Sequence, residues 1–120
     1  MKKLFLILTM VFCGIAKINA QTEASYPGGQ EAMVAFIDAN IHYPQAAIDN
    51  LIEGTVVVAF NVETDGKLKD IKVVRPLDPD LETEAVRVVT LMPVWIPATD
   101  ATGKAILQHV EIPVKFRLPY

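Results

Sequence analysis

The residues that could do chemistry in this chain are few and scattered. The two histidines, His42 and His109, lie far apart in the sequence. Glu111 would share a strand face with His109, because side chains two positions apart in a strand point the same way. A histidine and a carboxylate can ligate a metal, but a protein site needs three or four such ligands. We therefore interpret His109 and Glu111 as half-exposed sheet residues. We expect no metal site and no cofactor.

The other candidates for catalysis or ligand binding lack their partner groups. Ser25 is the only serine, and no nucleophile elbow surrounds it. Asp78 and Asp80 match a fragment of a calcium loop without its other oxygen ligands. A phosphate-binding loop follows a strand and precedes a helix. Gly28-Gly29 precede a predicted helix, but no predicted strand comes before them. We expect a protein that is not an enzyme.

Composition and charge exclude several classes of protein. The chain has 120 residues, of which 52% are hydrophobic and 21% charged, as in one globular domain. Eleven basic residues stand against fourteen acidic ones, and no lysine-arginine block occurs, which excludes a nucleic-acid binder that relies on phosphate contacts. Residues 1–20 hold three of the eleven basic residues and none of the acidic ones, so the rest of the chain carries a net charge of −6.

The first twenty residues predict a secretory signal peptide. Lys2-Lys3 precede a 13-residue apolar run, Leu4–Ala16, and Ala20 is a small residue before the cut. A bilayer-spanning helix needs about 20 apolar residues, so this run is too short. We expect cleavage after Ala20 and secretion of the rest of the chain. The alternative is an uncleaved inner-membrane anchor, because Ile18 is not small. Cys13 lies inside the run, so the cleaved chain would contain no cysteine.

The elements that would position a site alternate between helices and strands. Residues 21–29 are polar and predicted to be loose, ahead of a domain over residues 30–120. Apolar spacing and turn residues predict helices at Gln30–Asn40, Gln45–Asn50 and from Asp78 to Pro93, and strands at 54–62, Leu68–Arg75 and Lys104–Leu118. Asp65-Gly66 predicts a type I′ hairpin between the first two strands. Trp95 is interpreted as a core residue at the corner before the last strand.

The order of these elements predicts an α+β fold. The helix between strands two and three is a crossover, so those two strands should be parallel. The first strand is antiparallel to both and apolar on both faces, so it lies between them. The sequence therefore predicts a small three-stranded antiparallel-type sheet of order 2-1-3, with the helices packed on one face. Pro113 cannot donate to a ladder, so the last strand should be an edge.

Several pieces of the sequence, in this order, resemble the C-terminal domain of TonB, the envelope energy transducer of Gram-negative bacteria. They are Tyr43-Pro44, Ala47, Ile52–Val56, Phe60–Val62, Asp65-Gly66, Ile71, Leu81 with Glu84–Val86, Met92–Trp95, Pro97-Ala98, Gly103 and Val110–Phe116. The Pro27-Gly28-Gly29 start and the Trp95–Ala98 corner are similar to versions common in Bacteroidetes. The resemblance covers Tyr26 to Leu118.

The resemblance implies a periplasmic domain of the cell envelope that supports transmembrane transport. In this family the domain binds the TonB box, a short extended segment of TonB-dependent outer-membrane receptors. It transmits proton-motive energy from inner-membrane motor proteins. The receptor peptide pairs with the open edge of the last strand, which by resemblance makes that strand the partner-binding segment here: Gln108, His109, Val110, Glu111, Ile112, Pro113, Val114 and Lys115.

The chain departs from a full TonB in its spacer. About ten residues separate Ala20 from the first predicted helix, without Glu-Pro or Lys-Pro repeats. At ~3.3–3.6 Å per extended residue, that stretch cannot cross a periplasm. We expect a stand-alone receptor-binding module. The alternative is a structural or adaptor protein of the envelope that uses its edge strand for protein–protein or self-association, including a homodimer.

Overall fold

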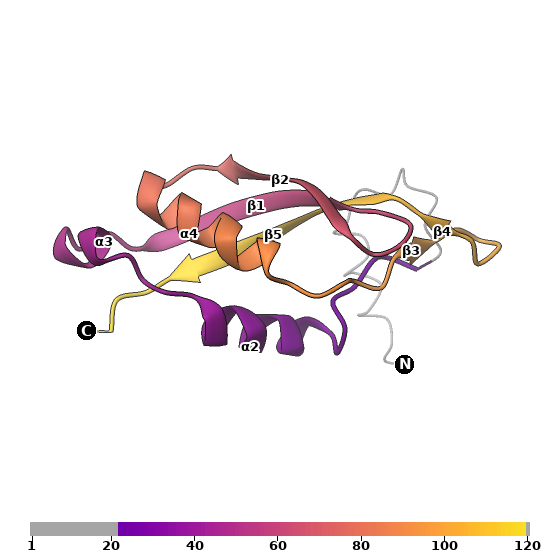
Figure 1. Cartoon of the computed structure of the whole chain (residues 1–120), viewed down its shortest axis with the longest axis horizontal. Helices are drawn as coiled ribbons and strands as arrows, with labels where there is room; N and C mark the ends of the chain where they lie inside the picture. The colour runs from indigo at the N-terminus through magenta and orange to yellow at the C-terminus, as the bar shows by residue number, and fades with distance from the viewer. Residues whose placement is uncertain (1–21, 120) are drawn as a thin grey trace, which may run out of the picture.

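A computed structural model describes residues 22–119 (Figure 1). The predicted signal peptide and Cys13 lie outside the described residues. The elements are α2 (Gln30–Asn40), α3 (Gln45–Asp49), β1 (Gly54–Val62), β2 (Leu68–Arg75), α4 (Pro79–Thr90), β3 (Ala98–Thr99), β4 (Ala105–Ile106) and β5 (Gln108–Phe116). None of the helices in this range is long and apolar enough to cross a bilayer.

The main sheet has the predicted topology. Its strand order is β2-β1-β5, and β1 is antiparallel to both neighbours. The central position of β1 follows from its sequence, because both of its faces are apolar enough to be covered. The α+β class and the 2-1-3 order are therefore confirmed, with β5 in the place of the third predicted strand.

The helices and one face of the sheet enclose the core. Even-numbered residues of β1 and β5 point to this side, as do the apolar positions of α2 and α4; the buried set includes Val56, Val58, Phe60, Val62, Ile112, Val114, Phe116, Met33, Ile37, Leu81, Ala85, Val88 and Val89. The helix α4 begins where the Asp78 carboxylate accepts bonds from the N–H groups of Asp80 and Leu81. Figure 1 shows α4 lying across the sheet, with α2 running beside β5 on the side away from β2.

Trp95 is a core residue, as its position predicted. Its side chain is 5% exposed. The indole makes edge-on contacts with Tyr26 and Phe60, with ring centroids 5.9 and 5.2 Å apart. Such tilted aromatic pairs are favoured beyond the area that they bury. The corner before the last strands is thus held by aromatic packing.

The hairpin between β1 and β2 differs in type from the prediction. Gly66, with a φ of 87°, has positive φ, whereas Asp65 does not. The N–H of Gly66 donates to the carbonyl of Glu63, and the N–H of Glu63 donates to the carbonyl of Lys67. The loop is therefore a three-residue connection with glycine in the left-handed position, and the predicted type I′ turn is wrong. Asp-Gly suits both turns, so the dipeptide alone does not separate them.

The predicted strand Lys104–Leu118 is two strands. The first part, β4, pairs with β3 in a separate small sheet, and Leu107 separates β4 from β5. The loop before β4 is closed by Asp100, whose Oδ1 accepts from the N–H and hydroxyl of Thr102 and from the N–H of Lys104. The hydroxyl bond from Thr102 lowers the pKa of Asp100. This local loop turns the chain back on itself, a contact that apolar alternation does not reveal.

The segment predicted to be loose over residues 21–29 is hydrogen-bonded in its described part. Thr22 forms a β-bridge with Thr99, and Ser25 forms one with Ile96. The N–H of Ala24 donates to Oε1 of Gln108 at 2.7 Å. Gln108 is buried at the start of β5, so its amide needs this partner. Polar composition suggested looseness, but two isolated β-bridges pair this segment with residues 96–99.

A clasp of charged and polar groups joins the end of α2 to α4. The Arg87 guanidinium donates to both carboxylate oxygens of Glu84 and to the carbonyl of Asn40. Glu84 also accepts the N–H of His42 at 2.6 Å. The Arg87 bonds, with the His42 N–H, hold the pKa of the Glu84 carboxyl below its ordinary value of 4.5. The clasp fixes α2 relative to the rest of the core.

Candidate functional site: an open sheet edge

All eight residues predicted to bind a partner lie in β5, at one edge of the main sheet. Their side chains fall into two sets. Three are buried and one is half-buried on the side of the helices: Gln108, Ile112, Val114 and Val110. The others are exposed: His109, Glu111, Pro113 and Lys115. Side-chain contact with a partner is therefore open to the odd-numbered set, whereas the even-numbered set supports the strand from below.

The backbone of β5 is regular along its whole length. Nine consecutive residue pairs join it to β1, from Gly54 and Phe116 to Val62 and Gln108, with no register shift. Within residues 22–119, β1 is its only strand neighbour. The outer side of β5 is consequently a straight row of peptide groups that no other described strand covers.

Pro113 indicates which peptide groups face outward. In an antiparallel pair, the N–H and C=O of successive residues point alternately toward the partner and away from it. Proline has no N–H, so the ladder to β1 is complete only if Pro113 is one of the outward-facing residues. Its outward position places the N–H groups of His109, Glu111 and Lys115 on the open side. The edge thus offers three donors, interrupted at one position.

The opposite edge of the sheet, β2, is irregular. The pairing of β1 with β2 shifts register between Val57 and Val58 and again between Ala59 and Asn61. In both places the extra residue belongs to β2, which makes them β-bulges. Asp70 lies at the second shift in the left-handed region, with a φ of 55°. Bulges of this kind prevent a further strand from pairing in register.

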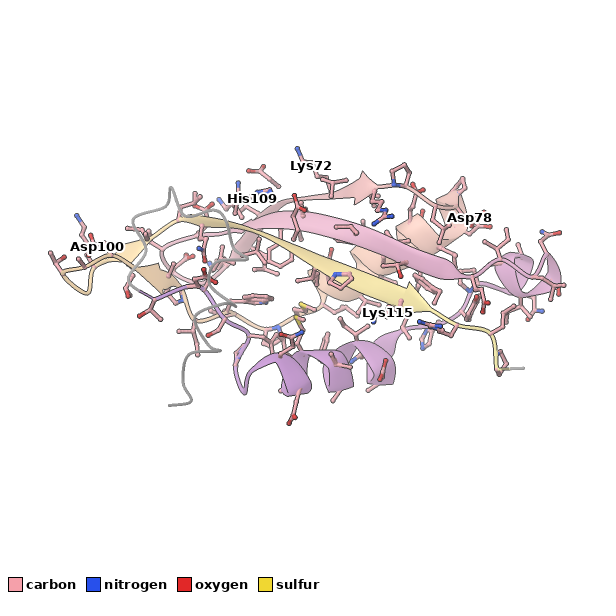
Figure 2. All side chains as sticks on the ribbon, turned by 180° about the vertical axis from the view of Figure 1, so that it is seen from behind. Lys72, Asp78, Asp100, His109 and Lys115 are labelled. Atoms are coloured by element: carbon pink, nitrogen blue, oxygen red, sulfur yellow. The ribbon has the colours of Figure 1, made fainter. Side chains whose placement is uncertain are left out.

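Polar side chains connect the strands on the face away from the helices. Nδ1 of His109 lies 3.2 Å from Oδ1 of Asn61, and Nε2 lies 3.5 Å from Glu111. Asn61 in turn donates to Asp70 at 3.0 Å. His109 and Lys72 line a shallow hollow of about 370 Å³ on this face, and both are labelled in Figure 2. In the described part of the chain no three potential metal ligands gather. The contacts link side chains of β1, β2 and β5.

A groove lies between β5 and α2. It has a volume of about 170 Å³ and is lined by Gln30, Met33, Val34, Ile37 and Asp38 of the helix and by Pro113 and Lys115 of the strand. Figure 2 shows Lys115 on β5, with α2 beside the strand. The sequence reasoning did not find the helix side of this groove. Val34 was its one signal, an aliphatic residue outside the buried stripe and 47% exposed.

Comparison with known proteins agrees with the fold. The family described as Gram-negative bacterial TonB protein C-terminal matches residues 39–118. Two solution structures of the Helicobacter pylori TonB C-terminal domain are similar. The one of residues 194–285 has 26% identity and a TM-score of 0.56 and covers 75% of this chain and 94% of its own. The one of residues 179–285 has 27% identity and a TM-score of 0.55, with 72% and 77% covered.

A search of curated proteins gives no matching sequence. The family match covers two thirds of the chain and includes β1, β2, α4 and the whole of β5. It supports a TonB-like role in energy transduction. The chain belongs to the TonB C-terminal domain family of Gram-negative bacteria.

Proposed function

We propose that this protein binds the TonB box of outer-membrane receptors by strand addition to β5, and so supports energy-dependent transport. The observation that carries the proposal is the regular outer side of β5, with nine unshifted pairs behind it and no described strand in front of it. An extended peptide adds to such an edge through main-chain hydrogen bonds, while side chains beside the edge give selectivity. The proposed binding segment is Gln108–Lys115.

The exposed side chains of β5 suit a polar, extended partner. His109, Glu111 and Lys115 stand in a row of mixed charge on one face of the edge. Charges of both signs favour specific over non-specific association, because a wrong partner would place like charges next to each other. The three outward N–H groups give the peptide its register. Main-chain hydrogen bonds would thus supply affinity for the peptide, and these side chains would supply specificity.

Cellular context completes the proposal. Family members act in the periplasm of Gram-negative bacteria as transducer and binding modules, not as enzymes. We place this chain there as well, with outer-membrane receptors as partners and inner-membrane motor proteins as the source of energy. The same open edge also favours a second candidate, self-association through β5 in an envelope adaptor, because an unpaired edge is a template for any strand.

The test uses the purified chain and a TonB-box peptide from a receptor of the same organism. Binding should shift the amide resonances of β5, and Glu111→Pro should weaken it at least about fivefold by deleting one outward donor. Val110→Pro is the matched control, since its N–H faces β1. Peptide binding that leaves the β5 amides unshifted would contradict the proposal, and a concentration-dependent dimer without peptide binding would favour the adaptor.

A further inference from the structure

The α2–β5 groove has the size and lining of a subsite for one side chain. Its apolar lining residues are Met33 and Ile37, each 7% exposed, together with Val34 and Pro113. Its volume of about 170 Å³ is comparable to the ~150 Å³ apolar cavities that hold a benzene molecule. One aliphatic side chain would therefore fill it.

The groove lies where a strand paired with β5 would place its side chains. Strands pair about 4.8 Å apart, so an added strand would lie beside β5, over the wall that α2 forms. Alternate side chains of that strand would point to the helix side of the sheet, where α2 runs beside β5 in Figure 1. The groove and the open edge are thus two parts of one surface.

Spacing links the groove to a second position on the helix. Residues two apart in a strand are about 6.6 Å apart, and residues four apart in a helix are about 6 Å apart. Val34 and Asp38 are four apart and both line the groove. A side chain that contacts Val34 would therefore have its same-face neighbour close to Asp38.

Charge indicates what that neighbour should be. The helix α2 carries Glu31 and Asp38 and no basic residue, and the chain after residue 20 has a net charge of −6. Asp38 makes no ion pair or side-chain hydrogen bond within residues 22–119. Lys115, which lines the groove from the strand, forms no ion pair with Asp38. The Asp38 carboxylate is therefore available to a cation of the partner.

We propose that this groove is a specificity subsite for an extended peptide that carries an aliphatic residue and, two positions away, a basic residue that meets Asp38. The inference rests on the proposed strand addition to β5. It adds the chemical class of the peptide: aliphatic-x-basic when the peptide runs parallel to β5, and basic-x-aliphatic when it runs antiparallel.

Synthetic nine-residue peptides of threonine and serine test the subsite. One pair carries valine at the centre and lysine two positions before or after it; control peptides replace valine with alanine or lysine with glutamate. Affinities come from amide shifts in titrations of the labelled chain. Losing two methyl groups should weaken binding roughly fifteenfold, and reversing the charge should weaken it two- to fivefold.

Variants of the chain locate the effect. Val34→Gln should remove the preference for valine over alanine, whereas Val74→Gln, on the opposite edge and 41% exposed, should leave it intact. Asp38→Asn should remove the preference for lysine over glutamate, whereas Glu31→Gln, on the same helix but outside the groove, should not. If β5 amides shift equally with every peptide, the subsite is wrong and strand addition stands. If no peptide shifts β5, strand addition itself is contradicted.

Discussion

The two edges of the main sheet are built in opposite ways. The β5 edge keeps one register for nine pairs, and its irregularity is confined to the missing donor of Pro113. The β2 edge contains two bulges within eight residues, one of them with Asp70 in the left-handed conformation. Both are outer strands of the same small sheet, with charged side chains along them. The difference lies in the backbone, which keeps one register at β5 and is bulged at β2.

This contrast indicates how the molecule avoids uncontrolled association. An exposed edge is a hazard because any extended chain can pair with it, and bulges and charges reduce that hazard. The protein protects one edge by bulges and leaves the other open beside the α2–β5 groove. Selective binding then requires only that the open edge be read by neighbouring side chains. Substitutions in four parts of the fold test this difference between the two edges.

Trp95→Ala should remove both edges together. The indole packs on Phe60 of the central strand and on Tyr26 before α2, so its loss empties a core site behind β1, on which both edge strands depend. We expect a loss of about 3–5 kcal/mol in the free energy of unfolding, a large part of the ~5–15 kcal/mol typical of a domain. Chemical denaturation measures it. An unchanged midpoint would contradict the buried position of Trp95.

Gly66→Ala should damage the β2 side in particular. A Cβ there would lie 2.1 Å from the Trp95 carbonyl oxygen, and the φ of 87° adds left-handed strain. We expect a loss of about 2–4 kcal/mol, of which strain accounts for roughly 1–2. Gly103→Ala is the matched control, because it has the same φ and no atom within 4 Å. Equal losses in thermal unfolding would show that the contact with Trp95 has no effect.

Val110→Pro and Glu111→Pro should separate stability from binding at β5. Because the N–H of Val110 faces β1, its proline variant leaves a β1 carbonyl without a donor and costs about 1–3 kcal/mol. Glu111→Pro should leave the midpoint of urea unfolding nearly unchanged while weakening peptide binding. A reversal of these two effects would place the outward donors at the even-numbered residues.

Acid should weaken the Glu84 clasp, which lies away from both edges. The pKa of Glu84 is lower in the folded protein than the ordinary 4.5, so its contribution is present above that value and is lost as the pH falls through the folded pKa. Glu84→Gln should cost about 1 kcal/mol at pH 7, since Arg87 is partly exposed to solvent. The difference in melting temperature between the unchanged protein and the Glu84→Gln variant should disappear as the pH falls. A difference that stays constant would exclude the Glu84 carboxylate as its cause.

Sequence reasoning predicted the fold well where the pattern is local or where proline and glycine restrict it. The apolar faces of β1 placed it at the centre, and Pro113 placed β5 at an edge. It did not predict the bulges of β2, because the extra residues, Asp70 and Val74, are recognised only when β2 is aligned against β1. It also missed the groove, since Val34 and Pro113 line one groove only after α2 and β5 have come together in the fold.

The contacts of the Glu84 clasp also could not be predicted from the sequence. Glu84 and Arg87 suggest a helix pair three residues apart, but their bonds to His42 and Asn40 join segments more than forty residues away. The separation of β4 from β5 depends on the Asp100 loop in the same way. Contacts of this kind are tertiary, and a single sequence shows only one partner of each.

Amide hydrogen exchange with and without a receptor TonB-box peptide tests the contrast between the edges most directly. We expect slower exchange at His109, Glu111 and Lys115, whose N–H groups face the open side of β5, and no change along Lys69–Val73 of β2. Protection at β2, or at neither edge while the peptide is bound, would contradict this expectation.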